Sequence, residues 1–79
     1  MTADDLATLR RNVDRNVRIV VTEGEVMVAK VVLVDDEYQD VIYDLVSTSQ
    51  PERYTKSPKE SAFVIPFSFI AHIDEIENR

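Results

Sequence analysis

The feature of this sequence that most restricts its fold is the run Glu25–Val34, which is apolar on both sides of an extended strand. Its side chains form two alternating sets: Val26, Val28, Val32 and Val34 on one side, and Met27, Ala29, Val31 and Leu33 on the other. A strand with one face in water alternates between apolar and polar side chains. The pattern therefore predicts a long strand covered on both faces, either by the curvature of a small barrel or by a neighbouring subunit.

The size of the chain makes additional stabilisation necessary. With 79 residues, we expect one domain spanning residues 1–79. Such a domain buries only about 60% of the surface that its unfolded chain exposes, and many small domains depend on disulfides, a metal or partner subunits. The sequence has no cysteine, and its single histidine, His72, cannot form a classical zinc site alone. Self-association is the stabilising route that remains, and 44% apolar residues suit it.

Local signals predict a helix over residues 2–12. Thr2 and Asp5 have the spacing of a capping box, and acidic residues in the first turn suit the positive end of a helix. Asn12 is a suitable stop signal. Three apolar residues share one face of this helix at helical spacing: Leu6, Leu9 and Val13.

The rest of the chain predicts five strands, over residues 17–22, 25–34, 40–46, 62–66 and 68–73. Gly24, the only glycine, marks a tight turn, and Asp35–Glu37 marks a second one. Ser47–Ser61 is polar and contains two prolines, so we expect a surface loop that tolerates replacement, or the extended tips of two strands. Pro66 marks a break between the last two strands. Short strands joined mostly by tight connections predict a mainly β domain, with a closed or nearly closed barrel over about residues 16–74.

Two stretches of this predicted order of strands and turns have the residue spacing of known motifs. The first runs through Glu23-Gly24, Ala29, Val31, Val34, Asp35, Tyr38, Asp40, Val41 and Ile42, with one extra residue in the turn. The second runs through Val64-Ile65, Pro66-Phe67 and the apolar stretch 69–73. Together they resemble the two motifs of Sm and Sm-like proteins over nearly the whole chain. The resemblance implies an N-terminal helix, a strongly bent five-stranded barrel and a homo-oligomeric ring. A different five-stranded barrel of the SH3-like class has the same order of strands and turns, and it remains an alternative fold for this chain.

The polar residues of the two motifs differ from the family pattern. The resemblance implies that Asp40 stands where the family has an asparagine, and Pro66-Phe67 where it has Arg-Gly, in the inner RNA pocket. Asp40 lacks the amide donor, and Pro66 supplies neither a charge nor a donor. We therefore expect RNA binding that is weak and salt-sensitive, with Tyr38 available for stacking. The alternative for Tyr38 is an aromatic side chain that covers the mouth of the barrel.

Basic residues near the helix are the second candidate RNA contact: Arg10, Arg11 and Arg15, with Arg18 in the same window. The chain has 15 acidic and 9 basic residues and a formal net charge of −6, which repels phosphate. The alternative is therefore that these arginines pair with carboxylates. A protein–protein adaptor barrel with no nucleic-acid role remains the competing function.

Interface residues are expected on the third strand and around the last two. In Sm-like rings the last two strands of adjacent subunits pair edge to edge, and this implies the following candidates: Val41, Tyr43, Leu45, Phe63, Ile65, Phe67 and Phe69. Packing in the core of a single chain is the alternative for the three phenylalanines.

The sequence gives no support for catalysis. His72 lies in an apolar strand without a recognisable nucleophile pattern, and the acidic turn 35–40 lacks the spacing of a calcium loop. We therefore expect no enzymatic activity, cofactor, metal or small-molecule substrate. No run approaches the ~18 apolar residues of a membrane span, and Met1–Arg10 does not resemble a signal peptide. A cytoplasmic protein is expected.

Overall fold

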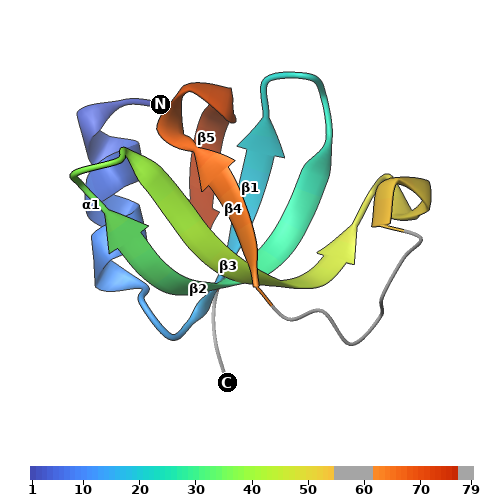
Figure 1. Ribbon diagram of the computed structural model, residues 1–79, viewed down its shortest axis with the longest axis horizontal. Helices are drawn as coiled ribbons and strands as arrows, with labels where there is room; N and C mark the ends of the chain where they lie inside the picture. The colour runs from blue at the N-terminus through green and yellow to red at the C-terminus, as the bar shows by residue number, and fades with distance from the viewer. Residues whose placement is uncertain (55–61, 77–79) are drawn as a thin grey trace.

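One helix and a five-stranded antiparallel sheet form the fold (Figure 1). The computed structural model describes residues 1–54 and 62–76. The elements are α1 (Ala3–Arg11), β1 (Asn16–Val21), β2 (Val26–Asp35), β3 (Asp40–Thr48), β4 (Phe63–Pro66) and β5 (Ile70–Glu75), with short 3-10 turns η1 (Pro51–Tyr54) and η2 (Phe67–Phe69). The strands pair antiparallel in the order β4-β3-β2-β1-β5. The mainly β class with an N-terminal helix is confirmed.

The sheet curls strongly but does not close into a hydrogen-bonded barrel. In Figure 1, β3 and β4 pass in front of β1 and β5, so that the sheet folds back over itself. β4 and β5 are the two ends of the strand order, and each has one paired neighbour in the sheet, β3 and β1 respectively. Helix α1 packs beside β5 and against part of β2. The curled sheet therefore has two edges, one at each end.

Helix α1 begins and ends where the local signals predict. The amide of Asp5 donates to Thr2 Oγ1 at 3.1 Å, and the amide of Thr2 donates to Asp5 Oδ2 at 2.9 Å, which completes the capping box. Asn12 is the C-cap, and its amide donates to the carbonyl of Leu9 at 3.1 Å. Leu9 is fully buried, whereas Val13 lies beyond the end of the helix and is exposed. The predicted apolar face is therefore wrong at Val13.

The core is built from the inward-facing residues of all five strands and one helical residue. Alternation along most of the strands sends every second side chain to the concave side of the curled sheet, whereas in β5 the buried residues Ile70 and Ile73 are three positions apart. Burying one such aliphatic side chain fully contributes about 1.5–3 kcal/mol. The buried apolar residues are Leu9, Val17, Ile19, Val21, Met27, Ala29, Val31, Val41, Tyr43, Ile65, Ile70 and Ile73.

The pairing of β2 with β3 is irregular at two places, with an extra residue on β2 at one and on β3 at the other. Its register against β3 shifts between Val31 and Leu33, so Val32 and Leu33 are both exposed, at 40% and 48%, and Val34 packs against the core. A second shift follows Val28 and leaves Val46 of β3 55% exposed. This chain therefore covers only one face of β2. Coverage of the other face by a neighbouring subunit stays a prediction.

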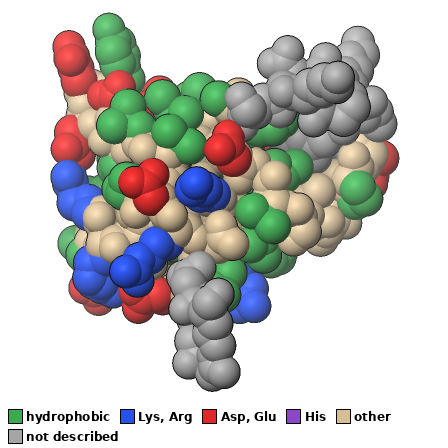
Figure 2. All heavy atoms as spheres, turned by 90° about the horizontal axis from the view of Figure 1, so that it is seen from below, with side chains coloured by type: hydrophobic (Ala, Val, Ile, Leu, Met, Phe, Trp, Pro, Cys, Tyr) green, Lys and Arg blue, Asp and Glu red, His purple; other side chains and the backbone are tan. Residues whose placement is uncertain are grey.

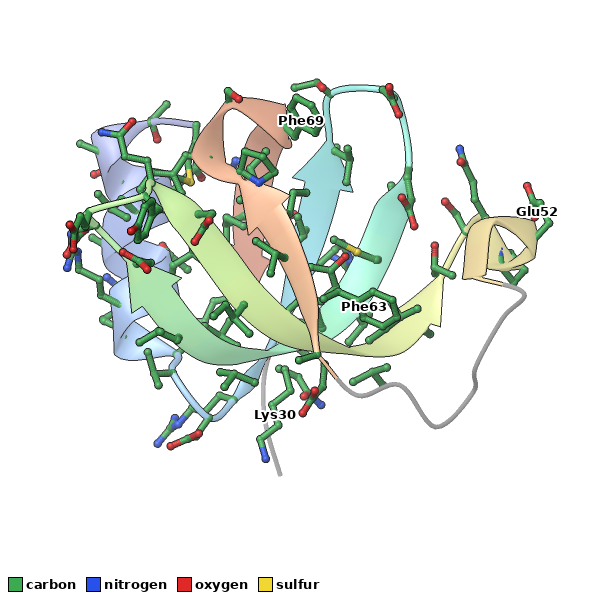
Figure 3. All side chains as sticks on the ribbon, in the orientation of Figure 1. Lys30, Glu52, Phe63 and Phe69 are labelled. Carbon is green, nitrogen blue, oxygen red and sulfur yellow. The ribbon has the colours of Figure 1, made fainter. Side chains whose placement is uncertain are left out.

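Several exposed apolar residues of β2, β3 and β4 lie on the convex side of the sheet. We call this surface the outer apolar face; its members are Val32, Leu33, Val46 and Val64. Figure 2 views the molecule from that side and shows hydrophobic side chains gathered in groups, with acidic and basic side chains between them. Lys30 of β2, labelled in Figure 3, extends from the same side.

The two predicted turns are both present, although the second is longer than expected. Gly24 has φ +102°, a backbone conformation that glycine adopts without strain, and its amide donates to the carbonyl of Val21 at 2.8 Å.

β3 continues to Thr48, two residues past its predicted end at 46, and η1 follows in the predicted loop Ser47–Ser61. Residues 55–61 of that loop lie outside the described residues.

Candidate functional site

The turn between β2 and β3 holds an aromatic side chain out into solvent. The side chain of Asp35 accepts hydrogen bonds at Oδ1 from the amides of Glu37 at 2.9 Å and Tyr38 at 3.1 Å. Gln39 has φ +57°, in the left-handed region, and this reverses the chain into β3. Tyr38 is 73% exposed. Its ring is therefore open to stacking and does not cover the interior of the sheet.

The residues predicted for the RNA pocket come together at this end of the sheet. Asp40 lies opposite Pro66 in the β3–β4 register, and the amide of Phe67 donates to the carbonyl of Gln39 at 2.8 Å. Tyr38, Asp40 and Pro66 therefore form one surface, which we call the turn surface. A shallow hollow of about 380 Å³ lies next to Gln39 and Phe67, between them and the start of α1.

The predicted basic residues are divided between two places, and those with resolved contacts are paired with acids. Both terminal nitrogens of the Arg10 guanidinium bond the carboxylate of Asp36, with Nη1 at 3.0 Å from Oδ2. Arg10 thus lies beside the turn surface, but a carboxylate balances its charge. Both side chains are about half exposed, so the pair contributes at most about 1 kcal/mol and phosphate could displace the carboxylate.

The other arginines gather near the end of β5. Arg11 Nη2 lies 3.7 Å from Glu75 Oε1, and Arg18 Nη1 lies 3.9 Å from Asp74 Oδ2. The side-chain amide of Asn12 donates to Glu75 Oε2 at 3.0 Å and lowers the pKa of the Glu75 carboxyl. The charge of Arg11 lowers this pKa further. Arg15 makes a smaller contribution of the same sign. This cluster is mixed in charge, and its carboxylates come from β5 and not from the β2–β3 turn.

Most of the predicted interface residues are packed within this chain. Val41, Tyr43 and Ile65 are buried because their side chains point to the concave side of the sheet. Leu45, Phe63 and Phe67 are partly buried and pack against the same core. The rings of Tyr43 and Phe63 stack at 5.7 Å between centroids. Only Phe69, 51% exposed, presents a large free surface among these seven.

Val64 was not among the candidate interface residues, although the sequence placed it on one of the last two strands, where edge pairing is expected. It lies between two inward-facing residues, Phe63 and Ile65, and is itself 58% exposed. Period-two alternation places its side chain on the face opposite the buried Ile65. The side chains of Val41, Tyr43 and Ile65 are therefore corrected to core positions, while Val64 belongs to the free surface beside the β4 edge.

His72 joins the helix to β5. Its Nδ1 lies 3.0 Å from Asp5 Oδ1, and its Nε2 lies 2.8 Å from Asp74 Oδ1. Asp5 is buried, and its Oδ1 also accepts the amide of Ile73 at 3.1 Å. The sequence predicted Asp5 as a capping-box residue but did not predict its contact with His72, because the two residues are near each other only after folding.

The environment of Asp5 favours its ionised form. Burial raises the pKa of the carboxyl, but hydrogen bonds from the Thr2 and Ile73 amides and the Thr2 hydroxyl, together with the nearby His72, lower it by more. The pKa of Asp5 therefore lies below its usual value of 3.8. The arrangement fastens the first turn of α1 to the sheet.

A second hollow lies where the curled sheet leaves β4 facing the β1–β2 turn. It measures about 220 Å³, and we call it the seam hollow. Glu25 contributes to its lining although that residue is only 2% exposed, and the Thr48 hydroxyl donates to Glu25 Oε2. The sequence predicted Glu25 at the start of a strand, directly after the Gly24 turn, and did not indicate that its side chain is buried.

Comparisons with known proteins give no family for this chain. No protein-family model matches it, and no curated protein matches its sequence. In the two described stretches, 1–54 and 62–76, no helix is long and apolar enough to cross a membrane. In the same stretches, no group of three or more histidine, aspartate or glutamate side chains is arranged to hold a metal ion.

Proposed function

We propose that this chain is a non-enzymatic Sm-like domain that assembles with copies of itself. The observation that carries the proposal is the strand order β4-β3-β2-β1-β5, which makes β4 and β5 the edge strands of one curled sheet. A contact between two different edges is heterologous, and it produces a ring when the rotation between subunits closes. In this proposal β4 of one copy pairs with β5 of the next.

The exposed apolar side chains beside β4 support the same contact. Val64 lies opposite Ile42 in the β3–β4 register, and Ile42 lies opposite Leu33 in the β2–β3 register. Val64 and Leu33 are 58% and 48% exposed. A subunit docked on the β4 edge would remove this apolar row from water, at about 25 cal/mol for each Å² buried. Burial of this kind would supplement the small core of the chain.

The curled sheet also supports assigning the fold to the Sm-like and SH3-like small barrels. Those folds bend five antiparallel strands so strongly that the two halves of the sheet face each other, as β3 and β4 face β1 and β5 in Figure 1. Pairing with a second copy would extend the sheet at its open edges. In this proposal, the curled sheet of one chain is therefore one part of a larger sheet that continues through neighbouring copies.

RNA binding enters the proposal as a weak secondary activity of the turn surface. Tyr38 offers a ring, whereas Asp40 offers only acceptors and a negative charge. Arg10, the nearest predicted phosphate contact, already bonds Asp36. In an assembly these surfaces would repeat, so weak contacts could add by multivalency.

The competing function, a protein–protein adaptor without a nucleic-acid role, is favoured by the charge distribution. Arg10, Arg11 and Arg18 each lie within 4 Å of a carboxylate, and the formal net charge is −6. A surface of this kind gives little long-range attraction for phosphate. This function would still require a site for the partner protein.

Light scattering tests the assembly. At micromolar concentration the chain should give a multiple of 9.1 kDa, and Val64→Lys should reduce that mass because a charge would replace an apolar contact at the edge. Val13→Lys is the matched control, since Val13 is exposed but lies in the connection after α1. A 9.1 kDa monomer for the unmodified chain would refute the proposal, as would an equal loss of mass in both variants.

A further inference from the structure

Strands β2 and β3 present two matching rows of side chains on the convex side of the sheet. Each row has one charged residue between two apolar residues, and the two charges are opposite in sign. We call these six residues the paired rows: Val28, Lys30 and Val32 on β2, and Val46, Asp44 and Ile42 on β3. All six side chains are half-buried or exposed, because the alternate residues of both strands fill the core.

The two charged residues of the paired rows lie side by side without forming an ion pair. Lys30 is directly opposite Asp44 in the β2–β3 register. Figure 3 shows Lys30 extending away from the sheet. Among the residues that the structure describes, no carboxylate pairs with Lys30 and no basic side chain pairs with Asp44. Both charges are therefore available to a molecule that docks on this face.

The apolar residues of the two rows lie at matching positions along the strands. At one end, Ile42 is opposite Leu33, which directly follows Val32. At the other end, Val28 is opposite the residue that directly follows Val46. A half-turn about an axis that runs along the strands, midway between β2 and β3, therefore exchanges the two rows.

This symmetry favours a second copy of the chain as the occupant of the face. An isologous contact requires a surface that is complementary to itself, so that one residue meets a second and the second meets the first. The paired rows meet this requirement, because the rotation brings a lysine over an aspartate and apolar residues over apolar ones. A nucleic acid would instead meet the carboxylate of Asp44 on a chain of net charge −6.

We propose that the paired rows form a two-fold interface between two copies of this chain. Lys30 of each copy would bond Asp44 of the other, and the apolar residues at both ends of the rows would pack across the axis. Sheets packed face to face lie about 10 Å apart, a separation that a lysine and an aspartate side chain together can bridge. The interface lies over β2 and β3, whereas the proposed edge contact joins β4 to β5. This inference therefore goes beyond the edge contact and does not depend on it.

The curvature of the sheet limits the size of this interface. β2 and β3 are flanked by β1 and β4, and the sheet curls away from the convex face on both sides (Figure 1). Interfaces that bury less than about 1,200 Å² in total are typically weak and transient. We therefore expect a dissociation constant in the micromolar range or above, and the measurement needs protein concentrations up to about 1 mM.

Charge reversals test the interface by analytical ultracentrifugation. Lys30→Asp and Asp44→Lys should each raise the dissociation constant at least about tenfold, because two contacts between like charges replace two ion pairs. Glu37→Lys is the matched control. It changes the net charge as much as Asp44→Lys does, but it lies in the exposed β2–β3 turn and should not weaken association.

The double variant Lys30→Asp/Asp44→Lys separates pairing across the interface from a general effect of charge. It exchanges the two charges, so each aspartate again faces a lysine, and its dissociation constant should return to within about threefold of the unmodified value. A mixture of the two single variants should also associate more tightly than either variant alone, since their faces carry opposite charges.

Circular dichroism identifies the variants that fold. Val46→Lys, at a 55% exposed position of the paired rows, should also weaken association and replaces Asp44→Lys if that variant does not fold. The inference would be overturned by an unmodified chain that stays monomeric up to about 1 mM, by equal association of all variants, or by a folded double variant without rescue.

Val64→Lys keeps this test apart from the test of the edge contact. Association that responds to Val64→Lys but not to the charge reversals would support the edge contact and refute the two-fold interface. Association that responds to the charge reversals, with rescue, but not to Val64→Lys would support the two-fold interface and refute the edge contact.

Discussion

At the residue scale, Asp5 carries the contacts that hold the helix to the sheet. Its carboxylate accepts hydrogen bonds from Thr2 and Ile73 and faces His72. Asp5→Asn should lower the free energy of unfolding at pH 7 by about 1–3 kcal/mol, because a buried charge-assisted network loses its acceptor charge. Urea unfolding measures this change, and Asp4→Asn, an exposed neighbour in the same turn, should have little effect.

The pH dependence of the Asp5 contribution has a definite sign. Its pKa in the folded chain is below the usual 3.8, so the stabilisation is fully present above that value and is lost as the pH falls through the folded pKa. The difference between the unmodified chain and Asp5→Asn should therefore shrink below about pH 4. A difference that stayed constant down to pH 2 would contradict this account.

Tyr38 carries the residue-scale prediction for RNA. Because its ring is exposed, Tyr38→Ala should leave stability unchanged within about 0.5 kcal/mol. It should weaken the low-salt binding of oligo-U, oligo-A and a mixed strand about fivefold or more, since one stacked base is worth about 1–3 kcal/mol. Tyr38→Phe keeps the ring and should bind normally. Tight, uridine-selective binding at physiological salt would contradict a pocket that has Asp40 and Pro66 in place of the family residues.

At the element scale, the sequence predicted best what depends on neighbours along the chain. The capping box of Thr2 and Asp5, the stop at Asn12 and the turn at Gly24 are all local, and all are present. The bulges in the β2–β3 pairing could not be predicted in this way. They are set by how β2 pairs with β3, and a single extra residue reverses which side of the sheet each later side chain faces. Leu33 and Val34 exchanged faces for that reason.

One-sided burial of β2 can be tested with two adjacent valines. Val31 is fully buried and Val32 is 40% exposed, although the sequence predicted both faces of this strand to be covered. Val31→Ala should lower the free energy of unfolding by about 2 kcal/mol, through lost burial and a cavity. Val32→Ala should cost about 0.5 kcal/mol or less in the isolated subunit. Equal losses, measured by chemical unfolding of both variants, would contradict burial of one face alone within the subunit.

At the scale of the whole molecule, the assembly depends on surfaces whose role a single sequence does not identify. The predicted interface list contained Val41, Tyr43 and Ile65, which are core residues, because apolar strands look alike whether a core or a subunit covers them. In the turn surface, Asp40 lies opposite Pro66 in the β3–β4 register, and the role of these residues and of Tyr38 in RNA binding stays a prediction. The pairing of Arg10 with Asp36 was foreseen only as a general alternative, because long-range ion pairs depend on the fold.

The central claim is that β4 of one copy pairs with β5 of the next, and the absence of cysteine in the sequence allows a direct measurement. Val64→Cys on β4 and Ala71→Cys on β5 introduce thiols at exposed positions of the two edge strands. Under mild oxidation the double variant should give a ladder of disulfide-linked oligomers on a non-reducing gel. Each single variant should lack that ladder, because equivalent edges do not meet in a heterologous contact. If the double variant gave only uncrosslinked monomer on the gel, with a light-scattering mass of 9.1 kDa, this result would contradict the account.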